Sequence, residues 1–442
     1  MTPISNLAYP DINKTDSLRF RTLAEWLTWQ MRLHFTAVEL GLDRCRCIAA
    51  KMGLLNPDFK VISVAGTNGK GSSVTMLDLI LRNSGYQVGR YTSPHLIRYN
   101  ERICINGNEV TDDQLCESFE RIDRARGDVT LTYFEFGTLA ALDLFMASGI
   151  DLAILEVGLG GRLDAVNILD ADLALVSGID LDHQQWLGND RDSIAREKAG
   201  IFRSSSPAVC SDIDTPQSLI DYAAELGTSL YLQGRDFHIR MEKNTWSWYS
   251  ADKHYVDLPR PVRYGDFQIY NAAGVLMLLT LLSKTSPVEE KAIRQGLQDF
   301  HLPGRFQIIP GEIQIILDVA HNRQAARTLA ENLRLLSGNG TTHVLIGMLK
   351  DKDRLAVFEA LSPIVDVWHT VTLPQERGAD AETLCGDLRQ TGFTGAINRY
   401  ESVASALDMI RAGAVQGDRL VVTGSFLTVS AAIQHLNLPG LS

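Results

Sequence analysis

The chain contains 442 residues and carries a formal net charge of −11, with 45% hydrophobic and 21% charged residues. This length exceeds the roughly 100–200 residues of a usual domain, so we expect two or three domains. The composition is that of a globular protein and excludes a fibrous or low-complexity chain. The negative charge argues against a surface that neutralises nucleic acid or an anionic membrane, so we expect small-molecule partners and no nucleic acid.

Cysteine usage and apolar segments predict a cytoplasmic protein without a membrane span. The six cysteines are scattered without metal-ligand spacing, which is typical of reduced thiols in a cytosol. Charged side chains interrupt the first 20 residues, so we expect no secretory signal. The longest strongly apolar stretch, 272–282, is about half of the roughly 20 residues that a membrane helix requires, and it predicts a buried helix.

The first half of the chain predicts a mostly parallel sheet. Apolar periodicity over 22–55 indicates helices with a break at 39–43. A short apolar strand at 60–65 then runs into a glycine-rich turn and a helix over 72–83. Two more strand-like runs follow after segments of crossover length, at 152–157 and 173–177.

The second half predicts a change of architecture. Alternation over 237–249 indicates a small antiparallel sheet, and a helix over 288–300 ends before the turn Leu302-Pro-Gly304, where we place a domain boundary. Strands that alternate with helices then predict a second sheet; these strands are 313–317, 342–346, 365–368, 396–400 and 419–423. The expected fold class is α/β, with a P-loop ATPase domain containing a mostly parallel sheet over 1–301 and a smaller Rossmann-like α/β domain over 302–442.

The strongest local signal is the segment Ala-Gly-Thr-Asn-Gly-Lys-Gly-Ser at 65–72. Its glycines let backbone N–H groups close around phosphates, and the following helix N-terminus favours negative charge. The segment departs from the strict G-x-x-x-x-G-K-[ST] pattern in the position of its first glycine and in Gly71. A glycine turn with an exposed lysine is the alternative, which the flanking strand and helix disfavour. The predicted ATP-binding residues here are Thr67, Asn68, Gly69, Lys70, Gly71 and Ser72.

A second nucleotide pattern occurs near the start of the chain. Asn13-Lys-Thr-Asp16 matches the guanine-specificity pattern of GTPases. It precedes the phosphate loop and follows no predicted strand, so we interpret it as a coincidence. A nucleotide-dependent switch without a ligation product remains the alternative from a different functional class.

The segment 66–72 resembles the phosphate loop of the Mur ligase superfamily, and further motifs narrow this resemblance. Together they resemble the folylpolyglutamate synthase and dihydrofolate synthase family, from about residue 38 to the C-terminal end. These motifs are Tyr-Thr-Ser-Pro-His-Leu at 91–96, Asn-Glu-Arg at 100–102, Glu-Val-Gly-Leu-Gly-Gly-Arg-Leu-Asp at 156–164, Asp-His at 182–183, Arg-Glu-Lys-Ala-Gly at 196–200 and Leu-Pro-Gly-Arg-Phe at 302–306.

The resemblance implies an ATP-dependent acid–amino-acid ligase. Its expected partners are ATP, L-glutamate, dihydropteroate and tetrahydrofolate derivatives. Its expected cofactors are Mg²⁺ and a monovalent cation, and we expect a monomer. Glu39-Leu-Gly41 together with Thr132-Tyr-Phe134 resembles the bifunctional bacterial type. A folylpolyglutamate synthase without the second activity and another Mur-type amide ligase remain alternatives.

The resemblance also implies the metal ligands Ser93, Glu156 and His183. Two of them suit a hard ion such as Mg²⁺, and the histidine is the less usual ligand. Taken singly, Ser93 could start a turn and His183 could be a structural histidine. Glu156 could form a salt bridge, but an acid within an apolar strand needs a strong partner, which a metal ion supplies.

Lys198 matches the position at which the superfamily carries a carbamylated lysine, N6-carboxylysine, which replaces a cation by an anion. The alternative is a lysine on the helix surface that pairs with a nearby glutamate. Lys70, Lys198 and His183 are the expected catalytic residues.

Further binding residues follow from the resemblance. Arg305, Asp318 and Asn271 are expected to contact ATP, with His321 as a neighbour of unassigned role; the alternatives are a boundary ion pair for Arg305 and helix caps for Asp318 and Asn271. Aromatic residues of the substrate site could stack on a flat pterin ring, although Tyr133 and Phe134 alone would be core residues. The predicted substrate residues are Val38, Glu39, Leu40, Gly41, Thr132, Tyr133, Phe134, Glu135, Leu163, Asp164 and Ala165.

Overall fold

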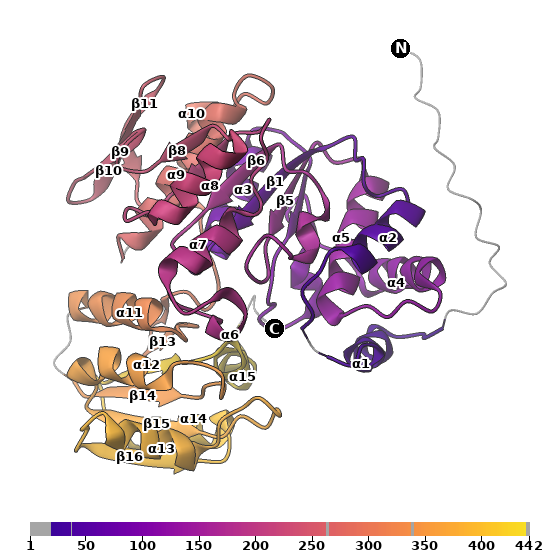
Figure 1. The fold of residues 1–442 in the computed structure, drawn as a ribbon. Helices are drawn as coiled ribbons and strands as arrows, with labels where there is room; N and C mark the ends of the chain where they lie inside the picture. The colour runs from indigo at the N-terminus through magenta and orange to yellow at the C-terminus, as the bar shows by residue number, and fades with distance from the viewer. Residues whose placement is uncertain (1–18, 37, 262–264, 337–339, 439–442) are drawn as a thin grey trace.

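The structure is a computed structural model that describes residues 19–36, 38–261, 265–336 and 340–438 (Figure 1). The Asn13–Asp16 pattern and most of the segment considered for a secretory signal lie outside these residues. The described strands form an eight-stranded, a three-stranded and a six-stranded sheet. Within the described ranges, no helix combines the length and apolar character needed to cross a membrane.

The eight-stranded sheet confirms the mostly parallel sheet expected for the first half of the chain. Its strand order is β4-β3-β2-β5-β1-β6-β7-β8, and the pairs formed by β3 are antiparallel whereas those among β2, β5, β1, β6, β7 and β8 are parallel. The strands are β1 (Lys60–Ala65), β2 (Val88–Tyr91), β3 (Ile103–Ile105), β4 (Asn108–Glu109), β5 (Leu152–Glu156), β6 (Leu173–Val176), β7 (Ala208–Cys210) and β8 (Leu230–Leu232).

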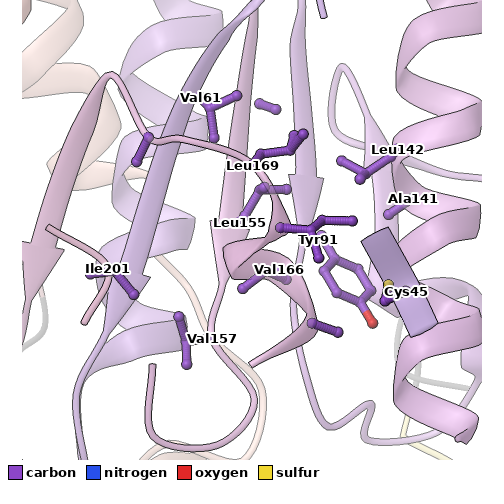
Figure 2. Close-up of a cluster of buried hydrophobic side chains, with 14 of the residues drawn as sticks. Cys45, Val61, Tyr91, Ala141, Leu142, Leu155, Val157, Val166, Leu169 and Ile201 are labelled. Atoms are coloured by element: carbon purple, nitrogen blue, oxygen red, sulfur yellow. The ribbon is translucent and has the colours of Figure 1, made fainter. Parts of the chain in front are cut away.

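Helices cover both faces of this sheet, so its central strands are apolar on both sides. In β1, Val61 packs in the core on one face, whereas Ile62 packs in the core on the other. Figure 2 shows part of the first core, where Tyr91 and Leu155 come from paired strands. The helices of this part are α1 (Leu23–Leu33), α2 (Asp43–Lys51), α3 (Lys70–Asn83), α4 (Asp112–Arg126), α5 (Tyr133–Ser148), α6 (Gln184–Leu187), α7 (Arg191–Ala199), α8 (Gln217–Leu226), α9 (Phe267–Leu282) and α10 (Glu290–Gln298), with the short 3₁₀ helices η1 (Tyr99–Arg102) and η2 (Ala165–Ile168).

The predicted antiparallel excursion is confirmed as a three-stranded sheet of β9 (Phe237–Met241), β10 (Thr245–Ser250) and β11 (His254–Pro259). It packs against α9, where the Trp248 indole donates a hydrogen bond of 3.1 Å to the carbonyl oxygen of Ala273. The apolar segment 272–282 lies within α9 and is buried, as expected. Figure 1 shows this small sheet far from the six-stranded sheet.

The six-stranded sheet confirms the second α/β unit and has the order β12-β13-β17-β14-β15-β16. All its pairs are parallel except β12 with β13. The boundary at 302–304 immediately precedes this sheet but stays a prediction. The strands are β12 (Gln307–Ile309), β13 (Gln314–Leu317), β14 (Thr342–Ile346), β15 (Val367–Val371), β16 (Ala396–Tyr400) and β17 (Arg419–Thr423). The helices are α11 (Arg323–Leu335), α12 (Arg354–Leu361), α13 (Ala381–Gln390), α14 (Val403–Gly413) and α15 (Phe426–Leu436), with η3 (Ser362–Ile364).

A histidine pair, with His369 buried and His343 half-buried, joins neighbouring strands of this sheet. His343 Nδ1 lies 3.1 Å from His369 Nε2, and His369 Nδ1 lies 3.3 Å from the Tyr400 hydroxyl. Asp418 lies 3.7 Å from the outer nitrogen of His343. Burial and, secondarily, His343 lower the pKa of His369 from 6.5 to about 4.

This pair predicts loss of stability in acid. Because the folded pKa of His369 lies below the unfolded value, the unfolded chain binds the proton first as the pH falls. Neutral His369 therefore contributes fully to stability above about pH 6.5, and this contribution is lost as the pH falls towards 4. The loss reaches about 2 kcal/mol at pH 5. Denaturant unfolding at pH 7.5 and 5.0 should show a smaller loss for His369→Gln than for the wild type, whereas the exposed control His254→Gln should behave as the wild type. An equal loss in all three proteins would contradict the expectation.

Candidate functional site

The glycine loop lies where three parallel strands end. In the sheet register Val64 of β1 is paired with Glu156 of β5, and Ala65 is paired with Val176 of β6, so the residues after these positions meet at one edge. The carboxyl edge of a parallel sheet is the usual ligand site of such folds. The loop residue Thr67 is fixed there, because its backbone N–H donates to Gly178 O at 2.7 Å.

Close packing explains why glycine occupies two loop positions. A Cβ atom on Gly66 would lie 1.9 Å from Ser177 Oγ, and one on Gly69 would lie 2.3 Å from Asn271 Oδ1. Gly69 also has a φ of 93°, in the left-handed region that disfavours other residues. The loop is therefore held against the end of β6 on one side and against α9 on the other.

Lys70 begins α3 and points back over the loop. Its Nζ donates hydrogen bonds to Gly66 O at 3.0 Å and Thr67 O at 3.2 Å. Burial lowers the pKa of Lys70, while the charges of Glu156 and Asp182 oppose this shift. A cation at a helix N-terminus, beside free backbone N–H groups, makes an electrostatic site for phosphate.

Glu156 and Ser93 lie together at the end of the sheet. The backbone N–H of Ser93 donates to Glu156 Oε2 at 3.2 Å, and Glu156 is 5% exposed. Glu156 forms no ion pair within the described part of the chain, which disfavours the salt-bridge interpretation. Burial raises its pKa, and Lys70 is the charge that most opposes this rise.

Asn271 lies inside α9, so the interpretation of Asn271 as a helix cap was wrong. The helix begins after Asp266. The Asn271 amide donates to Gln268 Oε1 at 3.1 Å, and the Gln268 amide donates to Ser72 Oγ at 3.0 Å. This chain of hydrogen bonds ties α9 to the first turn of α3.

Arg305 and Asp318 come from the second half of the chain to the same place. Burial lowers the pKa of Arg305, and the charge of Asp318 opposes this shift. The charge of Arg305 in turn opposes the rise in the pKa of Glu156. Asp318 accepts backbone hydrogen bonds of 2.8 Å from Phe306 and Ala320, whereas Asn322 caps α11, so the cap assigned to Asp318 was wrong. The Arg305 guanidinium lies 5.3 Å from the centre of the Phe426 ring.

Asp182 connects the two halves across the site. Lys352 Nζ donates to Asp182 Oδ1 at 2.6 Å, and His321 Nε2 lies 3.6 Å from Oδ2. The neighbouring His183 lies 3.4 Å from Lys352 Nζ, and burial lowers its pKa to about 4. The side-chain hydrogen bond with His321 and then the charge of Lys352 hold the pKa of Asp182 far below its usual range, against the opposing effect of burial.

The phosphate loop itself contributes to this contact between the halves. Asn68 Nδ2 donates to Gln324 Oε1 at 2.6 Å, and Asn322 Nδ2 donates to Asn68 Oδ1 at 3.1 Å. A residue predicted to bind ATP is thus hydrogen-bonded to the start of α11. Opening of the two halves would have to break these bonds.

Lys198 is buried in α7, which contradicts the alternative of a lysine on the helix surface. It is 3% exposed, and Glu197, the nearby glutamate, pairs with Arg162. No residue of the described ranges is a hydrogen-bond or ion-pair partner of Lys198 Nζ. Burial and then Lys70 lower the pKa of Lys198 to about 7, so a substantial fraction of the amine is neutral near that pH.

Every residue predicted to bind the acid substrate lines one cavity of about 860 Å³. Ser93 and His183 line the same cavity, and so do His321, Lys352 and Phe426 from the second half. The cavity therefore extends from the predicted substrate segments to the contact between the two sheets.

Local sequence explains how one wall of this cavity forms. Thr132 and Glu135 make a capping box that begins α5, with backbone-to-side-chain hydrogen bonds of 2.7 and 3.2 Å. The box sets Tyr133 and Phe134 in the first turn, where both line the cavity. A Cβ atom on Gly158 would lie 2.7 Å from the Phe134 ring, so glycine allows the ring its place.

Acidic side chains, of which Glu135 and Asp164 are buried and Glu39 is half-buried, add polarity to the apolar cavity. Arg44 forms ion pairs with both Glu39 and Glu135, so the two carboxylates share one guanidinium. Asp164 accepts backbone hydrogen bonds from Leu159 at 2.8 Å and Val166 at 3.1 Å. Burial nevertheless raises the pKa of Asp164 to about 7.

Sequence reasoning assigned no role to several residues that the structure brings to the site. Lys352 lies between two aspartates, in a run that resembles a solvated loop. Asn322 and Gln324 read as the start of a helix, and Phe426 gave no signal apart from its aromatic character. Nothing local in the sequence links these residues to Asp182 or Asn68.

The fold and site define a class of two-part nucleotide-binding α/β proteins in which a phosphate loop on one sheet faces residues from a second sheet. Family models agree with this class, since the Mur ligase middle domain matches residues 64–279 and the Mur ligase glutamate ligase domain matches residues 304–426. The chain belongs to the dihydrofolate synthase/folylpolyglutamate synthase family of Mur ligases.

Individual relatives support this membership. The chain is 43% identical to the dihydrofolate synthase/folylpolyglutamate synthase of Escherichia coli, covering 94% of this chain and 96% of the relative. The Haemophilus influenzae relative of the same name is 40% identical, over 92% and 96%. A solved structure of Escherichia coli FolC with DHPP and ADP superposes with a TM-score of 0.89 at 42% identity, covering 94% and 98%. A bifunctional folylpolyglutamate synthase/dihydrofolate synthase from Yersinia pestis, complexed with AMPPNP and Mn ion, gives 0.87 at 43% identity, covering 95% and 98%.

Proposed function

We propose that the protein is a bifunctional ligase that uses ATP to add L-glutamate to 7,8-dihydropteroate and to the glutamate tail of tetrahydrofolates. The observation that carries this proposal is the single cavity that joins the expected pterin segments to Ser93, His183 and the second sheet. Such continuity allows an acid substrate to reach both the nucleotide and an amino acid. The names of the relatives include both activities.

ATP would bind with its phosphates over the glycine loop. Backbone N–H groups and Lys70 supply positive charge there, and Arg305 supplies more from the second half. Asn271, fixed on α9 beside Gly69, is suited to the adenine side, and Asp318 lies next to Arg305. Similar solved structures with ADP or AMPPNP support this assignment.

Glu156 and Ser93 fit a divalent metal ion. A carboxylate that is buried without an ion-pair partner in the described residues, beside the backbone of Ser93, offers the hard oxygen that Mg²⁺ prefers; the Ser93 hydroxyl and His183 would supply further ligands. When bound, the ion would neutralise charge on the phosphate oxygens. A monovalent cation is retained as a second cofactor, and replacement of potassium in the assay would test it.

The reaction would proceed in two displacements. A carboxylate oxygen of the substrate attacks the γ-phosphorus of ATP, and the bond to the bridging oxygen of ADP breaks to give an acyl phosphate. Lys70 stabilises the charge on the transferring group. The amine of L-glutamate then attacks the acyl carbon, loses a proton, and expels phosphate to leave an amide. Contacts such as Asn68 with Gln324 would close the site against water, which would otherwise hydrolyse the acyl phosphate.

The pterin would occupy the end of the cavity formed by α5 and η2. Phe134 offers a face for stacking, and Asp164, with its pKa near 7, can exchange hydrogen bonds with a heterocycle. Glu39 and Glu135, fixed by Arg44, would shape the rest of the wall.

The proposal predicts phosphate release that depends on both substrates. Purified enzyme with ATP, Mg²⁺ and L-glutamate should release phosphate when either dihydropteroate or tetrahydrofolate is added, and mass spectrometry should detect a product heavier by one glutamyl unit in each case. Turnover with tetrahydrofolate alone would restrict the enzyme to polyglutamylation. Turnover with neither would favour another Mur-type ligase, or a switch if a protein partner changes the hydrolysis rate.

We assign the enzyme to the cytoplasm and expect a monomer. Free cysteines at all six positions suit a reducing compartment. Both halves of the site come from the same chain, so a second copy is not needed to complete it. Sedimentation of the purified protein would test the monomer.

A further inference from the structure

We propose that Arg102 binds the α-carboxylate of the folyl substrate and so supports glutamate addition to tetrahydrofolates more than to dihydropteroate. The inference rests on the proposed function. Dihydropteroate carries one carboxylate, which is the group that reacts. A tetrahydrofolate monoglutamate carries an α-carboxylate in addition to its reacting γ-carboxylate, so a second anion site in the cavity would distinguish the two substrates.

Arg102 ends η1 and lines the substrate cavity while being 8% exposed. Its guanidinium lies 5.3 Å from the centre of the Tyr99 ring and 5.5 Å from that of Tyr133. Its Nε donates to His95 Nδ1 at 2.9 Å. These contacts fix the plane of the guanidinium and leave Nη1 and Nη2 for other partners.

The positive charge of Arg102 has no counter-charge among the described residues. No carboxylate of the described residues forms an ion pair with Arg102, and Nη1 and Nη2 donate no hydrogen bond to these residues. Both nitrogens nevertheless keep some solvent accessibility. His95 accepts the Arg102 hydrogen bond through Nδ1 and supplies no negative charge. A buried, unpaired cation is costly unless a ligand supplies an anion, and Arg102 lines the cavity in which such a ligand would lie.

The reacting carboxylate is not the anion that Arg102 would bind. The positive charges that act most strongly on Glu156 are those of Lys70, Arg305 and Arg90. The charge of Arg102 instead opposes the rise that burial causes in the pKa values of Tyr99 and Tyr133. A carboxylate held for phosphoryl transfer near Glu156 therefore leaves Arg102 free for a second carboxylate, which its two parallel N–H donors match.

The test compares the two acid substrates on one variant. Arg102→Met should raise the KM for tetrahydrofolate by roughly tenfold or more, because a charge-assisted hydrogen-bond pair is lost. The KM for dihydropteroate should change by less than about threefold, and it reports that the variant is folded. The matched control is Arg98→Met, an exposed residue outside the cavity, which should leave both KM values unchanged.

A second measurement uses the wild-type enzyme, so it does not depend on the fold of a variant. A tetrahydrofolate whose α-carboxylate is replaced by a carboxamide should show the same increase in KM as Arg102→Met, and the variant should no longer distinguish acid from amide. Arg102→Lys should give an intermediate KM, since it keeps the charge but loses the paired donors. An equal loss for both acid substrates, or no discrimination against the amide by the wild type, would overturn the inference while leaving both ligase activities of the wild type intact.

Discussion

Replacement of Lys70 by alanine is expected to lower the turnover number by at least roughly 100-fold, because the ammonium group stabilises charge on the transferring phosphoryl group. The structure adds a second consequence. Lys70 is the charge that most opposes the raised pKa of Glu156, so its loss should raise that pKa further. As the pH falls, more Glu156 would be protonated and unable to bind a divalent ion. The Mg²⁺ concentration for half-maximal activity should therefore rise more steeply with falling pH in the variant than in the wild type.

Steady-state phosphate release across a Mg²⁺ titration at several pH values measures both effects. Lys51→Ala is the matched control, since Lys51 is an exposed lysine at the end of α2 and should retain wild-type turnover. Near-normal turnover with an unchanged Mg²⁺ requirement in Lys70→Ala would remove Lys70 from the mechanism.

Replacement of Lys198 by alanine should also lower turnover by roughly 100-fold or more if the lysine acts as a carbamate. The neutral Nζ would attack the carbon of CO₂ and release a proton to water, so that a buried amine becomes an anion. A pKa of about 7 keeps part of the amine neutral and reactive near neutral pH, and this fraction falls as the pH falls. A short carboxylic acid such as acetate should partly restore the activity of Lys198→Ala, because it returns an anion to the space left by the side chain.

The modification itself can be observed without an activity assay. Protein equilibrated with ¹³C-bicarbonate should give a carbamate signal by NMR that Lys198→Ala and Lys198→Arg lack. The exposed Lys291 of α10 provides a control, and Lys291→Ala should retain both the signal and the activity. A wild-type protein without the signal, and a Lys198→Ala variant indifferent to acetate, would leave Lys198 as an unmodified buried lysine.

Local pattern in the sequence was enough to predict most of the elements. The strand at 60–65 is β1 with the same bounds, and the strands at 342–346, 396–400 and 419–423 are β14, β16 and β17. Boundaries shifted by a few residues where no pattern defines them. The helix expected over 72–83, for example, begins at Lys70 because the left-handed Gly69 ends the loop there.

The site was predictable to the extent that its residues lie in recognisable motifs. Resemblance supplied the substrate segments, and the structure brings them to one cavity, although their roles stay predictions. It did not supply Lys352, which contacts Asp182, or Gln324, which contacts Asn68. Arg102 was part of a motif, yet the sequence could not indicate that its charge would be buried without a counter-charge.

The sequence by itself determined the phosphate loop, the alternation of strands and helices, and the family to which the motifs point. These features depend on backbone geometry and side-chain periodicity within a few residues, so a short segment of sequence is enough to specify each of them. The tertiary structure alone decided that Lys198 is buried, that Glu156 lacks an ion pair within the described chain, and that Asp182 meets Lys352. Burial and long-range pairing depend on how whole sheets and helices pack, and that packing sums many weak contacts between segments far apart in the chain.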